Sequence, residues 1–335
     1  MGVVVAVFFI FHALPGDPVS MMAGQRTDVS TKEAIMKDLG LDQPLRKQLV
    51  YYFNDLSPIS FHANTEENQK KYGYLSLIST EKTSLVLKIP YLRRSFQSNK
   101  KVSEIIWEHL EGTFWLALSS MIFATFLGIL MGIVAGLNQN TWIDHSLLSF
   151  SVIGISAPSF VAAILMAMFF GFYWAEYTGL NITGQLWVTD SIHGKQLELR
   201  NLILPTVTLG LRPLAIIVQL TRSSMLEVLS QDYIRTAKAK GLQKFTVIYK
   251  HALKNALNPV ITAVSGWLAS LMAGAFFIEY IFNWKGIGMV TIKAVENLDF
   301  PVVMGSTLFI ALIFIFINLL VDILYAVVDP RVRLT

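Results

Sequence analysis

The chain has 335 residues, of which 53% are hydrophobic and 15% are charged. Soluble domains carry about 25% charged residues, so this composition excludes an ordinary water-soluble enzyme, and the high apolar content excludes a disordered chain. Cysteine is absent, which excludes disulfides, thiolate catalysis and cysteine-based metal sites. The net charge of +4 is concentrated in one loop and does not point to nucleic acid.

Five long apolar stretches predict membrane-spanning helices, because about 20 mainly apolar residues cross a bilayer. The first two carry no charge, and each of the others carries one charged residue. The five stretches are 113–137, 146–174, 201–220, 257–282 and 301–328.

The apolar start of the chain, residues 1–14, is too short to cross a bilayer unaided. It has neither the basic region nor the cleavage site of a secretory signal. One interpretation is a buried or interfacial apolar stub. We favour a first transmembrane helix over 1–19 whose initial turns are missing, because the charge distribution requires a sixth crossing.

Basic residues are most frequent in the loop 221–256, which has seven Lys and Arg, and the tail 329–335 adds two. The short loops on the other side, 175–200 and 283–300, have four together. The positive-inside rule therefore predicts a cytoplasmic loop and cytoplasmic termini. Residues 113–328 form the membrane core, and 20–112 lie outside the cell.

The outer segment 20–112 is predicted to contain amphipathic helices. A capping-box spacing opens a helix over about 30–40, and Pro44 starts another. The apolar face of 102–110 indicates a helix on the membrane surface that turns into the next span. Residues 54–101 have no period and stay unassigned.

Signatures of catalysis and cofactor binding are missing from the sequence. The six histidines are scattered, and no phosphate-binding loop occurs. Gly286 and Gly288 lack the third glycine and preceding strand of a dinucleotide site. We therefore expect no enzyme activity and no bound cofactor or metal.

Small residues recur every four positions in 113–137, including Gly128, Gly132 and Gly136. Such a stripe lets another helix approach closely. It serves either static packing in the bundle, which we favour, or a moving interface in a conduit.

Arg212 lies in the middle of a predicted span, where an unpaired charge is costly. It either pairs with another intramembrane residue such as Asp322 or contacts an anionic group of a passing solute. Four prolines interrupt or border the spans and permit bending: Pro158, Pro205, Pro213 and Pro259.

The basic loop predicts two short helices, about 225–240 and 243–256, on either side of Gly241. Gly241 can take the left-handed conformation that ends the first helix. Seven basic residues against Glu227 and Asp232 give the loop a net charge of about +5. It is either a hairpin pinned to anionic lipid or a docking element for a cytoplasmic protein.

The segment IRTAKAKGL (234–242), followed by HALKNAL (251–257), resembles the EAA loop of ABC-importer permeases. The chain resembles more closely the permeases of dipeptide, oligopeptide and nickel importers (DppB/OppB-like). Further matching segments are LPGDP (14–18), ISAPSFVAA (155–163), LTRSSMLEVL (220–229), IEYIFNWKGIG (278–288) and VDILYAVVDPRVR (321–333).

The sequence departs from the family pattern at a few positions. Arg235 and Thr236 stand where the general EAA pattern has glutamate and alanine, and His251 and Lys254 replace a later isoleucine and proline. Lys285 replaces a proline that is common before GIG. The first two differences are usual in the peptide-permease branch.

The resemblance implies an all-α polytopic membrane protein with six transmembrane helices and the type I ABC importer permease fold. It implies a second homologous permease, two cytoplasmic ATPases that bind ATP and Mg²⁺, and an extracytoplasmic substrate-binding protein, in a bacterial cytoplasmic membrane. The expected substrates are di- or oligopeptides, with nickel or another small solute as the alternative. The implied ATPase-coupling residues are Arg235, Thr236, Ala237, Lys240, Gly241, Leu242 and His251.

Two other functions compete with an importer subunit. A stand-alone carrier or channel predicts inverted repeats and grouped ionisable residues at mid-membrane, and the sequence has neither. A membrane scaffold without transport would make the docking loop coincidental. Co-purification with an ATPase separates these functions.

Overall fold

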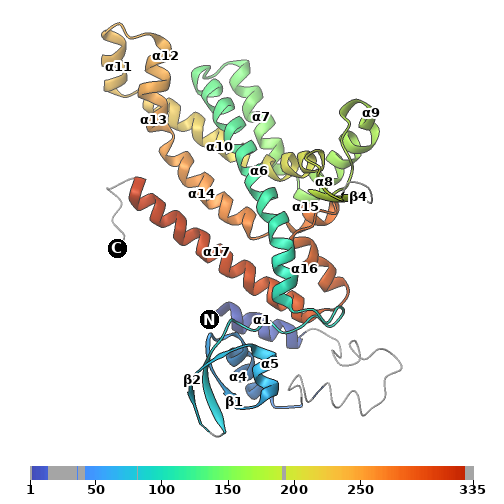
Figure 1. The fold of residues 1–335 in the computed structure, drawn as a ribbon. Coiled ribbons are helices and arrows are strands. Elements are labelled where there is room, and N and C mark those ends of the chain that lie inside the picture. The colour runs from blue at the N-terminus through green and yellow to red at the C-terminus, as the bar shows by residue number, and fades with distance from the viewer. Residues whose placement is uncertain (1, 14–35, 37–41, 81, 191–193, 329–335) are drawn as a thin grey trace. The chain divides into compact units, whose positions relative to one another are not determined.

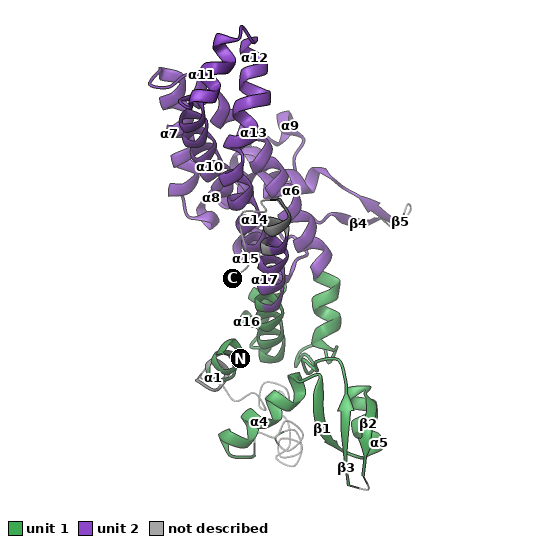
Figure 2. Cartoon of the chain, turned by 90° about the vertical axis from the view of Figure 1, so that its left-hand side faces the viewer, with its two compact units in different colours: residues 1–109, 290–311 green, residues 110–289, 312–335 purple. Residues whose placement is uncertain are grey.

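The computed structural model describes residues 2–13, 36, 42–80, 82–190 and 194–328. The chain is mostly helical (Figure 1), and it divides into two compact units (Figure 2). Unit 1 comprises residues 1–109 and 290–311, and unit 2 comprises residues 110–289 and 312–335.

Unit 1 combines short helices with a small antiparallel sheet of order β1-β3-β2. Its complete elements are α1 (Gly2–Ala13), α4 (Leu45–Leu56), β1 (Ile59–Ala63), α5 (Glu66–Tyr72), β2 (Leu75–Ser79) and β3 (Thr83–Leu87). The helices α6 (Val102–Leu137), α16 (Ile287–Glu296) and α17 (Phe300–Val328) contribute residues to both units.

Most of the side chains that the sheet of unit 1 buries are polar, although Val86 is buried as well. Ser60 and Lys88 are buried, whereas Phe61 and Leu75 are about 70% exposed. The Lys88 ammonium donates a hydrogen bond to the backbone carbonyl of Asp55 at 2.6 Å, and burial lowers the pKa of Lys88 to about 8. The sequence left this region unassigned because its apolar residues do not mark a buried face.

Apolar contacts inside unit 1 hold the first helix of the chain, α1, in place. Val7 and Phe8 of α1 are buried against Tyr52 and Met304. The helix expected after Pro44 is confirmed as α4. The crossing over 1–19 stays a prediction. The helix expected over 30–40, the LPGDP segment and the tail 329–335 lie outside the described residues, except Met36.

Unit 2 contains the helical core and one hairpin. Its elements, besides parts of α6, α16 and α17, are α7 (Trp142–Ser156), α8 (Ser159–Met166), the π-helical η1 (Ala167–Tyr173), α9 (Ala175–Thr178), β4 (Trp187–Asp190), β5 (Gly194–Leu197), α10 (Arg200–Leu229), α11 (Asp232–Ala239), α12 (Lys244–Thr246), the π-helical η2 (Val247–Ala252), α13 (Leu253–Ala256), α14 (Asn258–Met272) and α15 (Phe276–Ile281).

Three described helices are long and apolar enough to cross a membrane: Val102–Leu137, Arg200–Leu229 and Phe300–Val321. A fourth span results if α7 and α8–η1 count as one helix, although the chain bends by 107° between them. The continuous helices predicted over 146–174 and 257–282 are therefore wrong in detail. Pro158 is extended at the first break, and Gly274 has φ +117° at the second.

The surface helix predicted over 102–110 is helical, but it does not turn before the membrane span. It forms the first turns of the continuous helix α6. No proline interrupts α6, and Gly112 lies inside the helix although glycine often ends helices.

Helix α6 approaches α10 closely because glycines line the contact. Gly128, Gly132 and Gly136 face Ile217, Thr221 and Met225 in turn. A Cβ atom on Gly128 would lie 2.7 Å from the Ile217 side chain, and one on Gly136 would lie 3.0 Å from Met225 Cβ. The glycine stripe therefore lies in a helix–helix contact that has no room for side chains.

We predict that Gly132→Ala lowers the free energy of unfolding of the detergent-solubilised chain by about 1–3 kcal/mol, because the methyl group collides with Thr221 and Val218. Thermal unfolding measures the change. The matched control is Gly266→Ala on α14, where a Cβ atom meets nothing within 4 Å. The control should be neutral or stabilising by up to about 1 kcal/mol, and equal effects would contradict the packing argument.

Candidate functional site

Residues 232–256 form a helical projection at the end of α10, which we call the knob (Figure 1). The expected left-handed conformation of Gly241 is confirmed, with φ +76° between α11 and α12. The helix predicted from 225 is wrong: α10 continues to Leu229, and α11 begins at Asp232. The extended backbone of Gln231 separates them.

The knob has its own apolar core, which continues into the long helices of unit 2. Ile133 of α6 and Met225 of α10 belong to this core. Its members from the knob are Ile234, Ala237, Val247, Ile248, Ala252 and Ala256. The two arms are also joined by a hydrogen bond of 2.8 Å from the Asn255 amide to the Tyr233 hydroxyl. The knob is therefore mounted on α6 and α10 as a shaped element.

Most of the coupling residues implied by the resemblance lie on the knob surface. The exposed ones are Arg235, Thr236, Lys240, Gly241 and Leu242. Ala237 is buried in the knob core, and His251 is half-buried. Ala237 thus contributes to the internal packing of the knob rather than to its surface.

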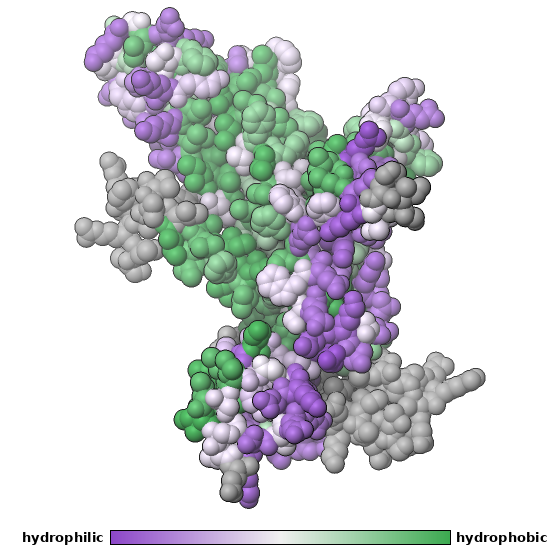
Figure 3. Space-filling view, viewed as in Figure 1, coloured by the Kyte–Doolittle hydropathy of each residue, from purple (hydrophilic) through white to green (hydrophobic). Residues whose placement is uncertain are grey.

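An exposed aromatic pair on the knob was not foreseen from the sequence. Phe245 is 67% exposed and Tyr249 is 45% exposed, and their ring centroids lie 4.2 Å apart. In the sequence Phe245 stands out only as one of several apolar residues among the basic residues of 243–256. The spacing of four residues between the two aromatics, offset from buried Val247 and Ile248, is the signal that was available. Hydrophilic and apolar side chains thus mix on the knob surface (Figure 3).

A buried ion pair ties α7 to α10 close to the knob. The fully buried Asp144 carboxylate accepts hydrogen bonds of 2.6 and 2.7 Å from Nε and Nη2 of Arg222. It also accepts one of 2.9 Å from the backbone N–H of Asn140. This bidentate geometry holds the two helices in register. The sequence counted Arg222 as a loop charge, because its partner lies 78 residues away.

A second buried carboxylate organises the GIG segment. Glu279 is fully buried and accepts hydrogen bonds from the Thr113 hydroxyl at 2.8 Å and the Met289 backbone N–H at 3.0 Å. A Cβ atom on Gly286 or Gly288 would collide with this carboxylate. The two glycines therefore let the chain wrap around Glu279, which accounts for the motif without a nucleotide.

A cavity of about 200 Å³ lies in unit 2 where both helix breaks meet α10. Ala157 and Ser159 line it beside the first break, and Gly274 lines it at the second. Arg212 and Trp267 complete its polar and aromatic walls. The side chain of Asp322, the alternative partner of Arg212, lies outside the described residues.

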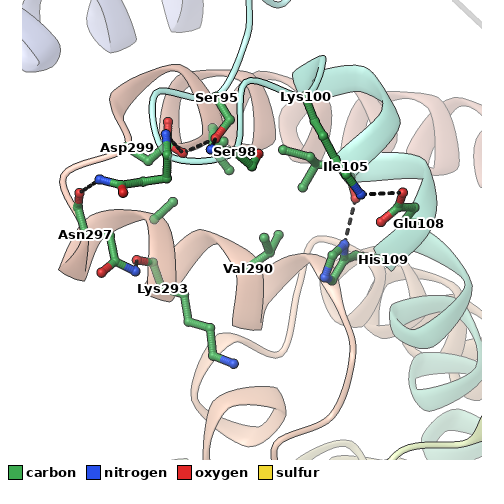
Figure 4. A pocket seen from close by; sticks show the side chains of 13 residues that line it. Ser95, Ser98, Lys100, Ile105, Glu108, His109, Val290, Lys293, Asn297 and Asp299 are labelled. Carbon is green, nitrogen blue, oxygen red and sulfur yellow. Dashed lines mark hydrogen bonds and ion pairs between the residues drawn. The ribbon is translucent and has the colours of Figure 1, made fainter. Parts of the chain in front are cut away.

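Another cavity, of about 280 Å³, lies in unit 1 (Figure 4). Three of its charged groups have partners: Lys100 pairs with Glu108 at 3.4 Å, and Asp299 accepts hydrogen bonds from Ser95 Oγ and from the backbone N–H of Phe96. The contacts of Asp299 fix the loop before α6. Among the described residues, no three His, Cys, Asp or Glu side chains form a metal-binding group.

Comparison with known families gives two matches that together span most of the chain. Residues 128–334 match the family described as binding-protein-dependent transport system inner membrane component. Residues 1–117 match the N-terminal region described for membrane components of the same transport systems.

Individual relatives cover nearly the whole chain. The dipeptide transport system permease protein DppB of Alkalihalophilus pseudofirmus is 35% identical, over 99% of this chain and 95% of its own. DppB of Escherichia coli K12 is 34% identical, over 99% and 94%. The glutathione transport system permease protein GsiC of Salmonella choleraesuis is 34% identical, over 99% and 94%.

The fold is also found among solved structures. A chain of the inward-facing MetNI methionine ABC transporter superposes with a TM-score of 0.55 at 15% identity. The superposition covers 68% of this chain and 97% of that chain.

We predict that Asp144→Asn lowers the free energy of unfolding by about 3–5 kcal/mol, because it leaves the Arg222 guanidinium without its buried partner. The double variant Asp144→Asn with Arg222→Gln should cost less than the sum of the two single variants. Thermal unfolding of the solubilised chain gives all three values. Strict additivity would mean that the pair does not hold α7 on α10.

Proposed function

Because the chain belongs to the family of binding-protein-dependent transport system inner membrane components, we propose that it forms half of the translocation pathway of an ATP-driven importer for di- and oligopeptides. Its fold is the type I ABC importer permease fold, and it is a multi-pass inner-membrane protein rather than an enzyme. The observation that carries the proposal is the exposed knob built on α6 and α10.

A peptide substrate is supported by the names of the relatives, which transport dipeptides or glutathione. Nickel or another small solute is the alternative, because permeases of the resembled family serve those substrates as well. The extracytoplasmic binding protein would make the first selection among substrates.

The knob is the docking element for an ATPase in this proposal. Its exposed Arg235 and Lys240 are positively charged, and its exposed Leu242 is apolar. The exposed Phe245 adds an aromatic side chain of the kind enriched in protein interfaces. ATP and Mg²⁺ are bound and used by the ATPase, and this chain hydrolyses nothing. An anionic lipid surface is the other occupant that the basic charge would suit.

Movement of the knob is transmitted along α10 and α14, which lead into it and out of it. Pro205 and Pro213 lie inside α10, and Pro259 lies in the first turn of α14. Pro205 and Pro213 each remove a backbone hydrogen bond of α10 and so make bending easier, whereas Pro259 is compatible with a helix start. A shift at the knob would thus change which side of the pathway is open.

The proposed assembly contains a second homologous permease, two ATPases and an extracytoplasmic binding protein. The knob and both termini face the cytoplasm, and the segment 20–112 lies outside, with six crossings in total. The excess of basic residues in 221–256 supports this orientation. Co-purification with an ATPase distinguishes the importer from a stand-alone carrier or a scaffold.

We predict that Gly241→Val uncouples ATP hydrolysis from peptide uptake while the chain still inserts. A valine at φ +76° strains the turn and shifts the two arms of the knob, although a Cβ atom meets nothing within 4 Å. Uptake by proteoliposomes of the complete complex should fall at least tenfold, with ATPase activity measured in parallel.

The matched control for Gly241→Val is Gly179→Val, at φ +63° and equally free of neighbours within 4 Å, but far from the knob in sequence. It should leave uptake within about twofold of the wild-type rate. Unchanged uptake in Gly241→Val, or an equal loss in both variants, would remove the knob from the coupling role.

A further inference from the structure

We propose that the cavity in unit 2 receives the terminal carboxylate of a transported peptide, and that Arg212 is the residue that binds it. This inference rests on the proposed function and deepens it, because it names a chemical group of the substrate and the side chain that recognises it.

The cavity lies beside two helix interruptions, one in the bent candidate span formed by α7 and α8–η1 and one between α14 and α15. The first interruption is at Ala157–Pro158, and the second includes Gly274 in a backbone conformation that disfavours other residues. Non-helical backbone at membrane depth is tolerated where it lines a water-filled space, because its N–H and C=O groups need partners. Two breaks on one cavity therefore mark a hydrated chamber within the helical core.

Arg212 places a positive charge on the wall of this chamber. Among the residues that the structure describes, none forms an ion pair or hydrogen bond with its side chain. A guanidinium at the middle of a span needs water or an anion to offset its desolvation. Arg222 on the same helix differs, because it forms a bidentate ion pair with Asp144.

The remaining walls complement the end of a peptide. Of the described residues that line the cavity, Arg212 alone is charged, so the chamber favours anions. Ser159 and Ser270 add hydroxyl groups, and Trp267 and Phe277 add aromatic surface for an apolar side chain. A planar guanidinium binds a carboxylate through two parallel hydrogen bonds, which makes the carboxyl end the group that fits.

The test compares a dipeptide with its C-terminal amide, which removes the carboxylate and little else. Uptake is measured in proteoliposomes of the complete importer, with binding protein saturated by each peptide and rates expressed per occupied binding protein. Wild type should import the free acid at least tenfold faster than the amide. In Arg212→Gln the ratio should fall below about threefold, through loss of acid uptake rather than gain of amide uptake.

Two further variants complete the design. Arg212→Lys keeps the positive charge but cannot form the bidentate hydrogen bonds of a guanidinium. It should give a ratio of free-acid to amide uptake between those of wild type and Arg212→Gln. Arg200→Gln, at the start of the same helix and outside the cavity lining, should keep the wild-type ratio. If Arg212→Gln fails to assemble, the ratios of wild type and Arg212→Lys still decide.

The outcomes separate this inference from the proposed function. If the wild-type importer carries neither peptide, the proposed function fails. If it imports both peptides at equal rates, or if Arg212→Gln lowers both rates by the same factor, peptide import stands and the carboxylate site is overturned.

Discussion

The close contact between α6 and α10 is the constraint on which the helical core depends. Glycines at three successive turns of α6 bring its backbone against Ile217, Thr221 and Met225. The same contact continues into the knob core through Ile133 and Met225. A side chain anywhere along this seam would therefore disturb both the helix pair and the base of the knob.

Helix α10 links the functional features that the structure reveals. Its middle carries Arg212 on the cavity wall, its later turns carry Arg222 in the ion pair with Asp144, and its end leads into the knob. A rigid helix transmits displacement along its length, and the prolines at 205 and 213 provide places for bending. Helix α10 thus positions the cavity wall, the ion pair with α7 and the knob.

The sequence predicted what composition and period encode, namely the apolar spans, the helix after Pro44 and the turn at Gly241. It missed the breaks at Pro158 and Gly274, because apolar runs continue through both. It also missed the sheet over 59–87, because most of the side chains that this sheet buries are polar. It also missed the partners of Asp144 and Glu279, which lie 78 and 166 residues away. Hydrophobic periodicity indicates which face of a helix or strand is buried, but it does not indicate which distant residues pair.

The central claim, that the knob is held by an ATPase inside the cell, is tested most directly by its accessibility. Because the natural chain has no cysteine, Lys240→Cys gives a single reactive site on the exposed part of the knob. A membrane-impermeant maleimide should label this cysteine in inside-out vesicles stripped of ATPase. It should not label the cysteine in cells whose cytoplasmic membrane is intact, even when their outer envelope lets the reagent through. Adding the ATPase subunits should block labelling. Labelling from outside the cell, or full labelling with the ATPase bound, would contradict the account.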